Sequence, residues 1–97
     1  MFEPDKPRYL TRGVDEQIPP ELQLFLWTAV DEMPDPKDYL QVFLLENVHG
    51  LQSIKHSSEE PEFHMTYVLP MIEDPITAKV YVIDSDEYCT MLLAEEY

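Results

Sequence analysis

The sequence predicts an α+β fold, in which an antiparallel sheet of about five to six strands carries one amphipathic helix packed on one face, in a single domain of residues 1–97. Two observations lead to this expectation. Residues 20–33 have the apolar spacing of a helix, whereas most of the remaining chain is β-prone. The β-prone stretches are joined by short connections, which favour antiparallel pairing because parallel strands need a long crossover. The expected order is one strand, the helix and then five strands.

The first expected strand is short and lies before the helix. Residues 8–12 are β-prone, and Gly13 ends the stretch. We expect residues 14–18 to form a loop that leads to the helix. Arg12 stands at a strand end in an acidic chain, so we expect it to pair with a carboxylate of its own chain rather than with a ligand.

The expected helix, residues 20–33, has the clearest pattern in the chain. Pro20 suits its first turn, because the missing N–H of a proline would have no helical partner there. Pro34 and Pro36 end the helix, since a proline disfavours helical backbone in the residue before it. Six apolar residues recur at helical spacing and form the face expected to pack on the sheet, namely Leu22, Phe25, Leu26, Ala29, Val30 and Met33.

Two large apolar residues of the helix lie outside this stripe. Leu24 and Trp27 are roughly 120° or more from its centre, and Asp31 lies between them in angle. Aromatic anchors within polar rims are the usual centre of a protein interface. We therefore expect Leu24, Trp27 and Asp31 to form an interaction surface for a protein partner or a second copy in a homodimer. The alternative is that the N-terminal arm folds back over Trp27 through Phe2 and Tyr9.

Five further strands are expected after the helix, over residues 39–46, 51–57, 62–69, 78–84 and 88–95. The first of the five has apolar residues on both sides, which is typical of a central strand buried on both faces. The third alternates with period two and is expected to be half-buried. Gly50 can adopt the positive φ that a hairpin turn over residues 47–50 requires.

The charge of the chain limits its partners. It has 20 acidic and 6 basic residues and a net charge of −14. Nucleic acids and anionic membranes carry the same sign, so direct binding of either is not expected. Solubility explains such acidity most simply, whereas a basic partner or mimicry of a nucleic acid would give it a function. A single Cys, no apolar run of membrane-spanning length and no secretory signal at the start indicate a cytoplasmic protein.

The sequence offers no metal or cofactor motif. The nitrogen and sulfur ligands available are His49, His56, His64 and Cys89, and none stands at zinc-site spacing. His56 and His64 lie on neighbouring expected strands, but scattered surface histidines are the simpler interpretation. We expect no metal and no cofactor.

Catalytic patterns are equally weak. Cys89 stands in an apolar strand, where a buried thiol has a raised pKa, so we interpret it as a core residue. Glu60 and Glu62 with His64 would suit acid/base chemistry only if they were set in a cleft, and an exposed acidic turn is the commoner outcome. The expectation is that the protein is not an enzyme.

Four stretches of the chain resemble a known family. They are residues 9–14 (YLTRGV), 18–27 (IPPELQLFLW), 37–43 (KDYLQVF) and 90–97 (TMLLAEEY). In these stretches the sequence is similar to an uncharacterised family of Gram-positive bacteria and their mobile elements, catalogued as domain of unknown function 960. The resemblance implies a bacterial cytosolic protein, carried in some cases by a phage or plasmid. It implies no activity and no functional residues.

Taken together, these patterns predict a small acidic cytosolic protein that acts as a non-enzymatic protein–protein interaction or regulatory module through the outer face of its helix. The alternative is a nucleic-acid charge mimic that inhibits a DNA-binding or defence protein. Mimicry requires carboxylates in regular rows on one face, spaced like phosphates.

Overall fold

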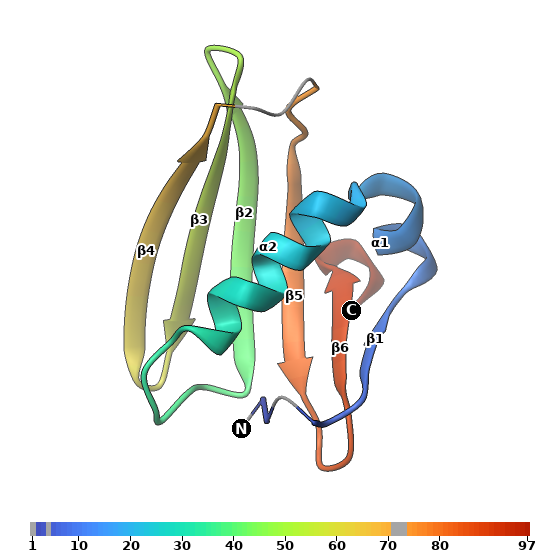
Figure 1. The fold of residues 1–97 in the computed structure, drawn as a ribbon, viewed down its shortest axis with the longest axis vertical. Helices are drawn as coiled ribbons and strands as arrows, with labels where there is room; N and C mark the ends of the chain where they lie inside the picture. Colours follow the sequence, from blue (N-terminus) through green and yellow to red (C-terminus); the bar gives the residue numbers. More distant parts are fainter. Residues whose placement is uncertain (1, 4, 71–73) are drawn as a thin grey trace.

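The computed structural model describes residues 2–3, 5–70 and 74–97, and a six-stranded sheet crossed by one helix organises them (Figure 1). This arrangement confirms the predicted α+β class. The chain order is β1 (Arg8–Leu10), α1 (Arg12–Gln17), α2 (Pro20–Asp31), β2 (Leu40–Val48), β3 (Leu51–Glu59), β4 (Glu62–Leu69), β5 (Ala78–Asp84), β6 (Cys89–Leu93) and a final 3-10 turn, η1 (Ala94–Glu96).

The strands lie in the order β1-β6-β5-β2-β3-β4. Hairpins join β2 to β3, β3 to β4 and β5 to β6, and β5 pairs antiparallel with β2 at the centre of the sheet. The turn between β2 and β3 has the predicted form, because Gly50 has a φ of 81° and its N–H donates to Asn47 Oδ1 at 2.9 Å. β1 departs from the antiparallel expectation: it runs parallel to β6, since no hairpin ties these two distant segments together.

A short helix, α1, replaces the loop expected over residues 14–18 and shortens the first strand to Leu10. Its N-cap is Thr11, whose hydroxyl oxygen accepts a hydrogen bond from the N–H of Val14 at 3.4 Å. The prediction was wrong because this cap is a local signal that the β-prone composition of residues 8–12 obscures. Val14 is fully buried, so α1 also contributes to the core.

The last strand is likewise shorter than the expected residues 88–95. The chain leaves the sheet after Leu93 because the Glu96 carboxylate turns back and accepts hydrogen bonds from the N–H of Leu93 at 2.8 Å and the Thr11 hydroxyl at 2.6 Å. It also accepts from the N–H of Gly13 at 3.2 Å. A Cβ at Gly13 would lie 2.7 Å from this carboxyl group, so glycine permits the close approach.

The helix α2 crosses one face of the sheet diagonally (Figure 1). It ends at Asp31 with Glu32 as its C-cap, two residues before the predicted end. The rings of Phe25 and Tyr67 meet edge to face with centroids 5.0 Å apart, so the apolar stripe reaches as far as β4. Most of the buried apolar residues form one core, which consists of Phe2, Val14, Ile18, Leu22, Leu26, Ala29, Val30, Phe43, Leu45, Ile54, Val80, Val82, Cys89, Met91 and Leu93.

The opposite face of the sheet is not covered by an α-helix of the described chain, although the ring of Tyr97, just after η1, packs edge to face on that of Tyr81 in β5. β2 is central, as predicted, but it is not buried on both faces. Phe43 and Leu45 are buried on the helix side. The residues of the other side are only half-buried, namely Leu40, Val42 and Leu44. The prediction was wrong because a strand with apolar residues on both sides can be buried on both faces or can leave one apolar face partly exposed.

His56 is a buried residue of the core side, contrary to the prediction of surface histidines. Its ring stacks on Phe43 with centroids 4.2 Å apart, and its Nε2 lies 2.7 Å from Gln41 Oε1. The amide oxygen can only accept, so Nε2 carries a proton. Burial lowers the pKa of His56 to about 4.

We predict that His56 makes the fold sensitive to mild acid. At pH values between its ordinary pKa of 6.5 and its folded pKa of about 4, His56 binds a proton in the unfolded chain but not in the folded chain. Stability should therefore be lost as the pH falls from 7 to 5, by about 2 kcal/mol. Urea denaturation of wild type and His56→Gln at several pH values in this range measures the loss, and the variant should lack it.

His64→Gln is the matched control, because His64 lies exposed on β4. It should keep the wild-type pH dependence. An equal dependence in wild type and His56→Gln would contradict the assignment of the effect to His56.

Candidate functional site

The outer face of α2 carries the three residues predicted to form an interaction surface. The side chain of Leu24 is 68% exposed, Trp27 is half-buried, and Asp31 is exposed in the last turn. This face therefore presents an exposed leucine beside a partly covered aromatic ring. Whether it binds a partner stays a prediction.

Trp27 packs in part against the hydrophobic core, and Arg8 of β1 covers the face of its ring. The guanidinium carbon of Arg8 lies 4.8 Å from the centroid of the indole ring. The same guanidinium forms a two-pronged ion pair with Asp31, in which Nη1 donates to Oδ2 at 3.0 Å and Nη2 donates to Oδ1. We call Arg8, Leu24, Trp27 and Asp31 the Trp27 patch.

The N-terminal arm thus does fold back over Trp27, with Arg8 over the ring, and Trp27 also packs against the core cluster that contains Phe2. Phe2 is buried in the core, and Tyr9 is 57% exposed with its ring against that of Tyr88. Successive strand residues point to opposite faces, so Arg8 and Leu10 share the helix side and Tyr9 the other. In the sequence Arg8 is only one of six basic residues, because no local pattern indicates that β1 lies beside α2.

The cover over Trp27 is weak enough for a partner to displace. A cation–π contact at a partly exposed site contributes roughly 0.5–1 kcal/mol, and an ion pair at the surface about as much. Arg8 Nε is buried and has no hydrogen-bond partner in the described part of the chain. Because Arg8 contacts both Trp27 and Asp31, the patch combines an aromatic ring, a guanidinium and a carboxylate that are already oriented with respect to one another.

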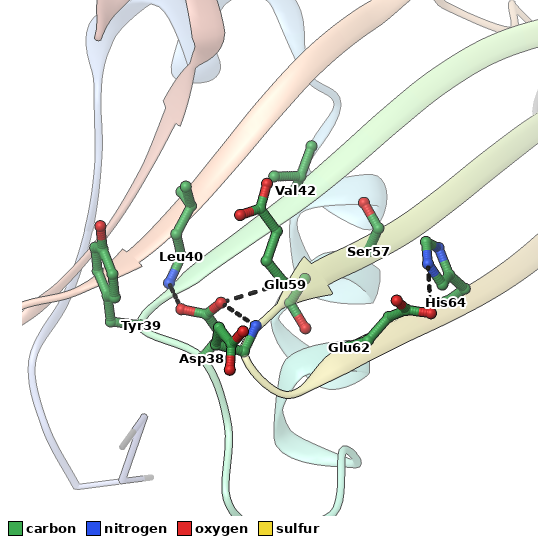
Figure 2. Close-up of a pocket in the computed structure, with 10 residues that line it drawn as sticks. Asp38, Tyr39, Leu40, Val42, Ser57, Glu59, Glu62 and His64 are labelled. Atoms are coloured by element: carbon green, nitrogen blue, oxygen red, sulfur yellow. Dashed lines mark hydrogen bonds and ion pairs between the residues drawn. The ribbon is translucent and has the colours of Figure 1, made fainter.

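A second candidate site is a pocket on the open face of the sheet, at the start of β2 and β4 (Figure 2). Asp38 lies at its base, where Oδ1 accepts from the N–H of Leu40 at 3.2 Å and Oδ2 accepts from the N–H groups of Glu59 at 3.2 Å and Glu60 at 2.8 Å. Burial by itself raises the pKa of Asp38, but hydrogen bonds from these backbone groups lower it below its ordinary value. Asp38 is thus an ionised structural anchor for the β3–β4 turn.

Glu62 and His64 also line this pocket. His64 Nε2 lies 3.7 Å from Glu62 Oε1, and both side chains are mostly exposed, at 72% and 80%. Figure 2 shows them at the pocket rim, away from Asp38. The sequence predicted that these residues lie close together in an exposed acidic turn. They are not enclosed, which is the environment that tunes a catalytic acid or base.

The other candidate ligands stay apart. His56 and His64 lie on neighbouring strands, but the register pairs His64 with Ser57, so the two rings point to opposite faces. Within residues 2–3, 5–70 and 74–97, no three His, Cys, Asp or Glu residues are grouped to hold a metal ion. The Arg12 side chain pairs with Glu16 at 3.0 Å, which is an internal ion pair of the kind predicted.

Cys89 is buried in β6, as the sequence indicated. Its Sγ lies 3.1 Å from Asp84 Oδ1, which also accepts a hydrogen bond from Lys6 Nζ at 2.9 Å. Burial raises the pKa of the Cys89 thiol to about 11, and Asp84 adds to this effect. The thiol is therefore protonated and protected rather than nucleophilic.

Many of the carboxylates gather at one end of the molecule. The connections α2–β2, β3–β4 and β5–β6 all lie at the lower end in Figure 1, and acidic residues are concentrated in them. They are Glu32, Asp35, Asp38, Glu59, Glu60, Glu62, Asp84, Asp86 and Glu87. The acidity is thus uneven over the surface, but its members lie in loops and strand ends rather than in rows along one face.

Comparisons with known proteins identify a family and a fold. The profile of a family described as staphylococcal protein of unknown function (DUF960) matches residues 7–96. A crystal structure of a protein of unknown function from Enterococcus faecalis superposes with a TM-score of 0.87 at 26% identity, over 99% of this chain and 94% of that one. No curated protein matches the sequence. In the described residues no helix is long and apolar enough to cross a membrane.

We predict that Arg8 is a removable cover over Trp27. In Arg8→Met the indole should become more exposed, so its fluorescence should shift to longer wavelength, while stability falls by no more than about 1–2 kcal/mol because only a cation–π contact and a partly exposed ion pair are lost. Trp27 is the only tryptophan, so the signal has one source.

Arg12→Met is the matched control, since it also breaks an exposed ion pair but lies away from the ring. It should leave the spectrum unchanged. An unshifted spectrum in Arg8→Met would show that other groups bury Trp27.

Proposed function

Since the chain belongs to the family described as staphylococcal protein of unknown function (DUF960), whose description assigns no activity, we propose a function from its surface. The protein is a cytosolic, non-enzymatic interaction or regulatory module. It binds a protein partner, or a second copy of itself, through the Trp27 patch on the outer face of α2.

One observation carries this proposal. The exposed side chain of Leu24 stands beside a half-buried indole that is covered by the displaceable guanidinium of Arg8. Tryptophan and arginine are the residues most enriched at the energetic centre of interfaces, and the bidentate Arg8–Asp31 pair fixes their orientation before binding.

The chemistry described above supports a non-enzymatic role. The buried titratable groups have partners within the fold: His56 Nε2 contacts Gln41, and Cys89 contacts Asp84, whereas His56 Nδ1 is buried without a partner among the described residues. The pocket of Figure 2 has an ionised structural carboxylate at its base and an exposed Glu62–His64 pair at its rim. Neither arrangement supplies a group whose pKa is raised toward neutrality for acid catalysis.

We predict that Leu24→Glu abolishes partner binding and preserves the fold. The side chain is 68% exposed, so stability should change by no more than about 0.5 kcal/mol, whereas a charge at the centre of an interface should weaken binding by at least about tenfold. A photo-crosslinking amino acid at position 28, beside the patch, should capture a discrete cytosolic protein or a second copy, and Leu24→Glu should remove that product.

Val48→Glu is the matched control, because Val48 is 45% exposed on the β2–β3 hairpin and the substitution adds the same charge. It should leave the cross-linked product intact. Equal capture by wild type, Leu24→Glu and Trp27→Ala would reject the patch. Loss of fold in Trp27→Ala alone would leave Leu24→Glu as the decisive variant.

The alternative function, charge mimicry of nucleic acid, has one observation in its favour, which is the acidic end formed by three neighbouring connections. A mimic should compete with duplex DNA for a DNA-binding protein, and its binding should weaken steeply as salt is raised. Neutralising Glu59, Glu60 and Glu62 to Gln should then reduce competition, whereas Leu24→Glu should not.

A further inference from the structure

The two edges of the sheet differ in how they are protected. The edge strand β1 has three residues, begins after Pro7 and carries Arg8, which is engaged with α2. The other edge strand, β4, has eight residues and pairs only with β3. No element of the described chain runs along its outer side (Figure 1). Its outward N–H and C=O groups are therefore available to another chain.

β4 also lacks the features that usually block pairing at an edge. Soluble proteins place lysine, proline or a bulge there. Residues 63–69 contain no Lys, Arg, Asp, Glu, Pro or Gly, although more than a quarter of the whole chain is charged. All eight residues of β4 pair in an unbroken register with β3, from Glu62 opposite Glu59 to Leu69 opposite Gln52. The edge is thus long, regular and uncharged over most of its length.

Apolar side chains stand exposed on both faces of this edge. Met65 is 45% exposed on the helix side, and Val68 is 54% exposed on the open side. An added strand would cover both, because its own side chains alternate between the same two faces. Backbone hydrogen bonds would provide affinity, and these apolar positions would provide selectivity.

The charge around the edge indicates which kind of chain fits. Glu59, Glu60 and Glu62 surround the start of β4, and neither Glu59 nor Glu60 forms an ion pair with a described residue. A second copy would bring a further charge of −14 to this edge, whereas a basic segment would be attracted to it. Charge complementarity therefore favours a basic partner over self-pairing.

We propose that the β4 edge accepts an extended segment of a basic protein as a seventh strand. Lysine or arginine side chains of that segment lie beside Glu60 and Glu62, and apolar side chains at alternate positions cover Met65 and Val68. This surface shares no residue with the Trp27 patch, whose Arg8 lies on β1 at the opposite edge of the sheet.

Short synthetic peptides test the proposal with the intact protein. The probe is a peptide of alternating valine and threonine that carries lysines at one end. One matched control peptide has glutamate in place of the lysines. The other keeps the lysines but has methyl groups on alternate backbone nitrogens. The lysine peptide should slow hydrogen exchange at β4 amides. Both control peptides should bind at least about tenfold more weakly. Added salt should weaken the binding of the lysine peptide.

A matched pair of variants locates the site. Val68→Lys places a charge on the edge, whereas Val48→Lys adds the same charge to a similarly exposed residue of β2, which β3 separates from the edge. Val68→Lys should lower the affinity for the lysine peptide at least about tenfold. Val48→Lys should bind this peptide with an affinity within about twofold of that of the wild type.

Three results would overturn the proposal. The first is unchanged exchange at β4 with millimolar lysine peptide, and the second is equal binding of the lysine and glutamate peptides. The third is protection of β4 that rises with protein concentration alone, which would identify a second copy as the occupant. Leu24→Glu should bind the peptide normally, so failure of this proposal is distinguishable from failure of the Trp27 patch.

Discussion

The packing of α2 across one face of the sheet is the interaction on which the rest of the structure depends. Leu22, Leu26 and Val30 are completely buried in the core. Burial of each such side chain contributes roughly 1.5–3 kcal/mol, so this stripe is the main reason why the helix is stable in its position. Since one side of α2 is used in this way, Leu24 is directed outward, and the uncovered face of the sheet is left partly exposed.

Polar contacts at the ends of the strands then connect segments that are distant in sequence. Asp38 binds the backbone of the β3–β4 turn, Glu96 binds the start of α1, and Lys6 binds Asp84 beside Cys89. Each joins a carboxylate to a donor contributed by another part of the chain. The acidity of the sequence is therefore partly structural, since these carboxylates accept hydrogen bonds that their segments need.

The two proposed surfaces use different physical properties. The Trp27 patch is a compact group of side chains oriented by one ion pair, and its selectivity would come from shape and aromatic contact. The β4 edge offers backbone groups, and its selectivity would come from the alternation of side chains and from nearby charge. The two surfaces share no residue, so a protein with both has separate sites for two partners.

Local patterns in the sequence were enough to predict a large part of this protein. The helix from Pro20, the strands β2 to β5 and the turn at Gly50 follow from residue periodicity, prolines and glycine, which act over a few neighbouring residues. The outward position of Leu24 follows from the same periodicity. The residues of the acidic turn, Glu60 and Glu62, also lie together because they are neighbours in sequence.

Only the tertiary structure decided the rest. Arg8 covers Trp27 because β1 pairs in parallel with β6, a contact between the two ends of the chain that no local pattern encodes. His56 is buried because its side of β3 faces the helix, and Val42 is half-exposed because its side of β2 does not. Periodicity shows which residues share a face of a strand, whereas long-range packing determines which face is covered.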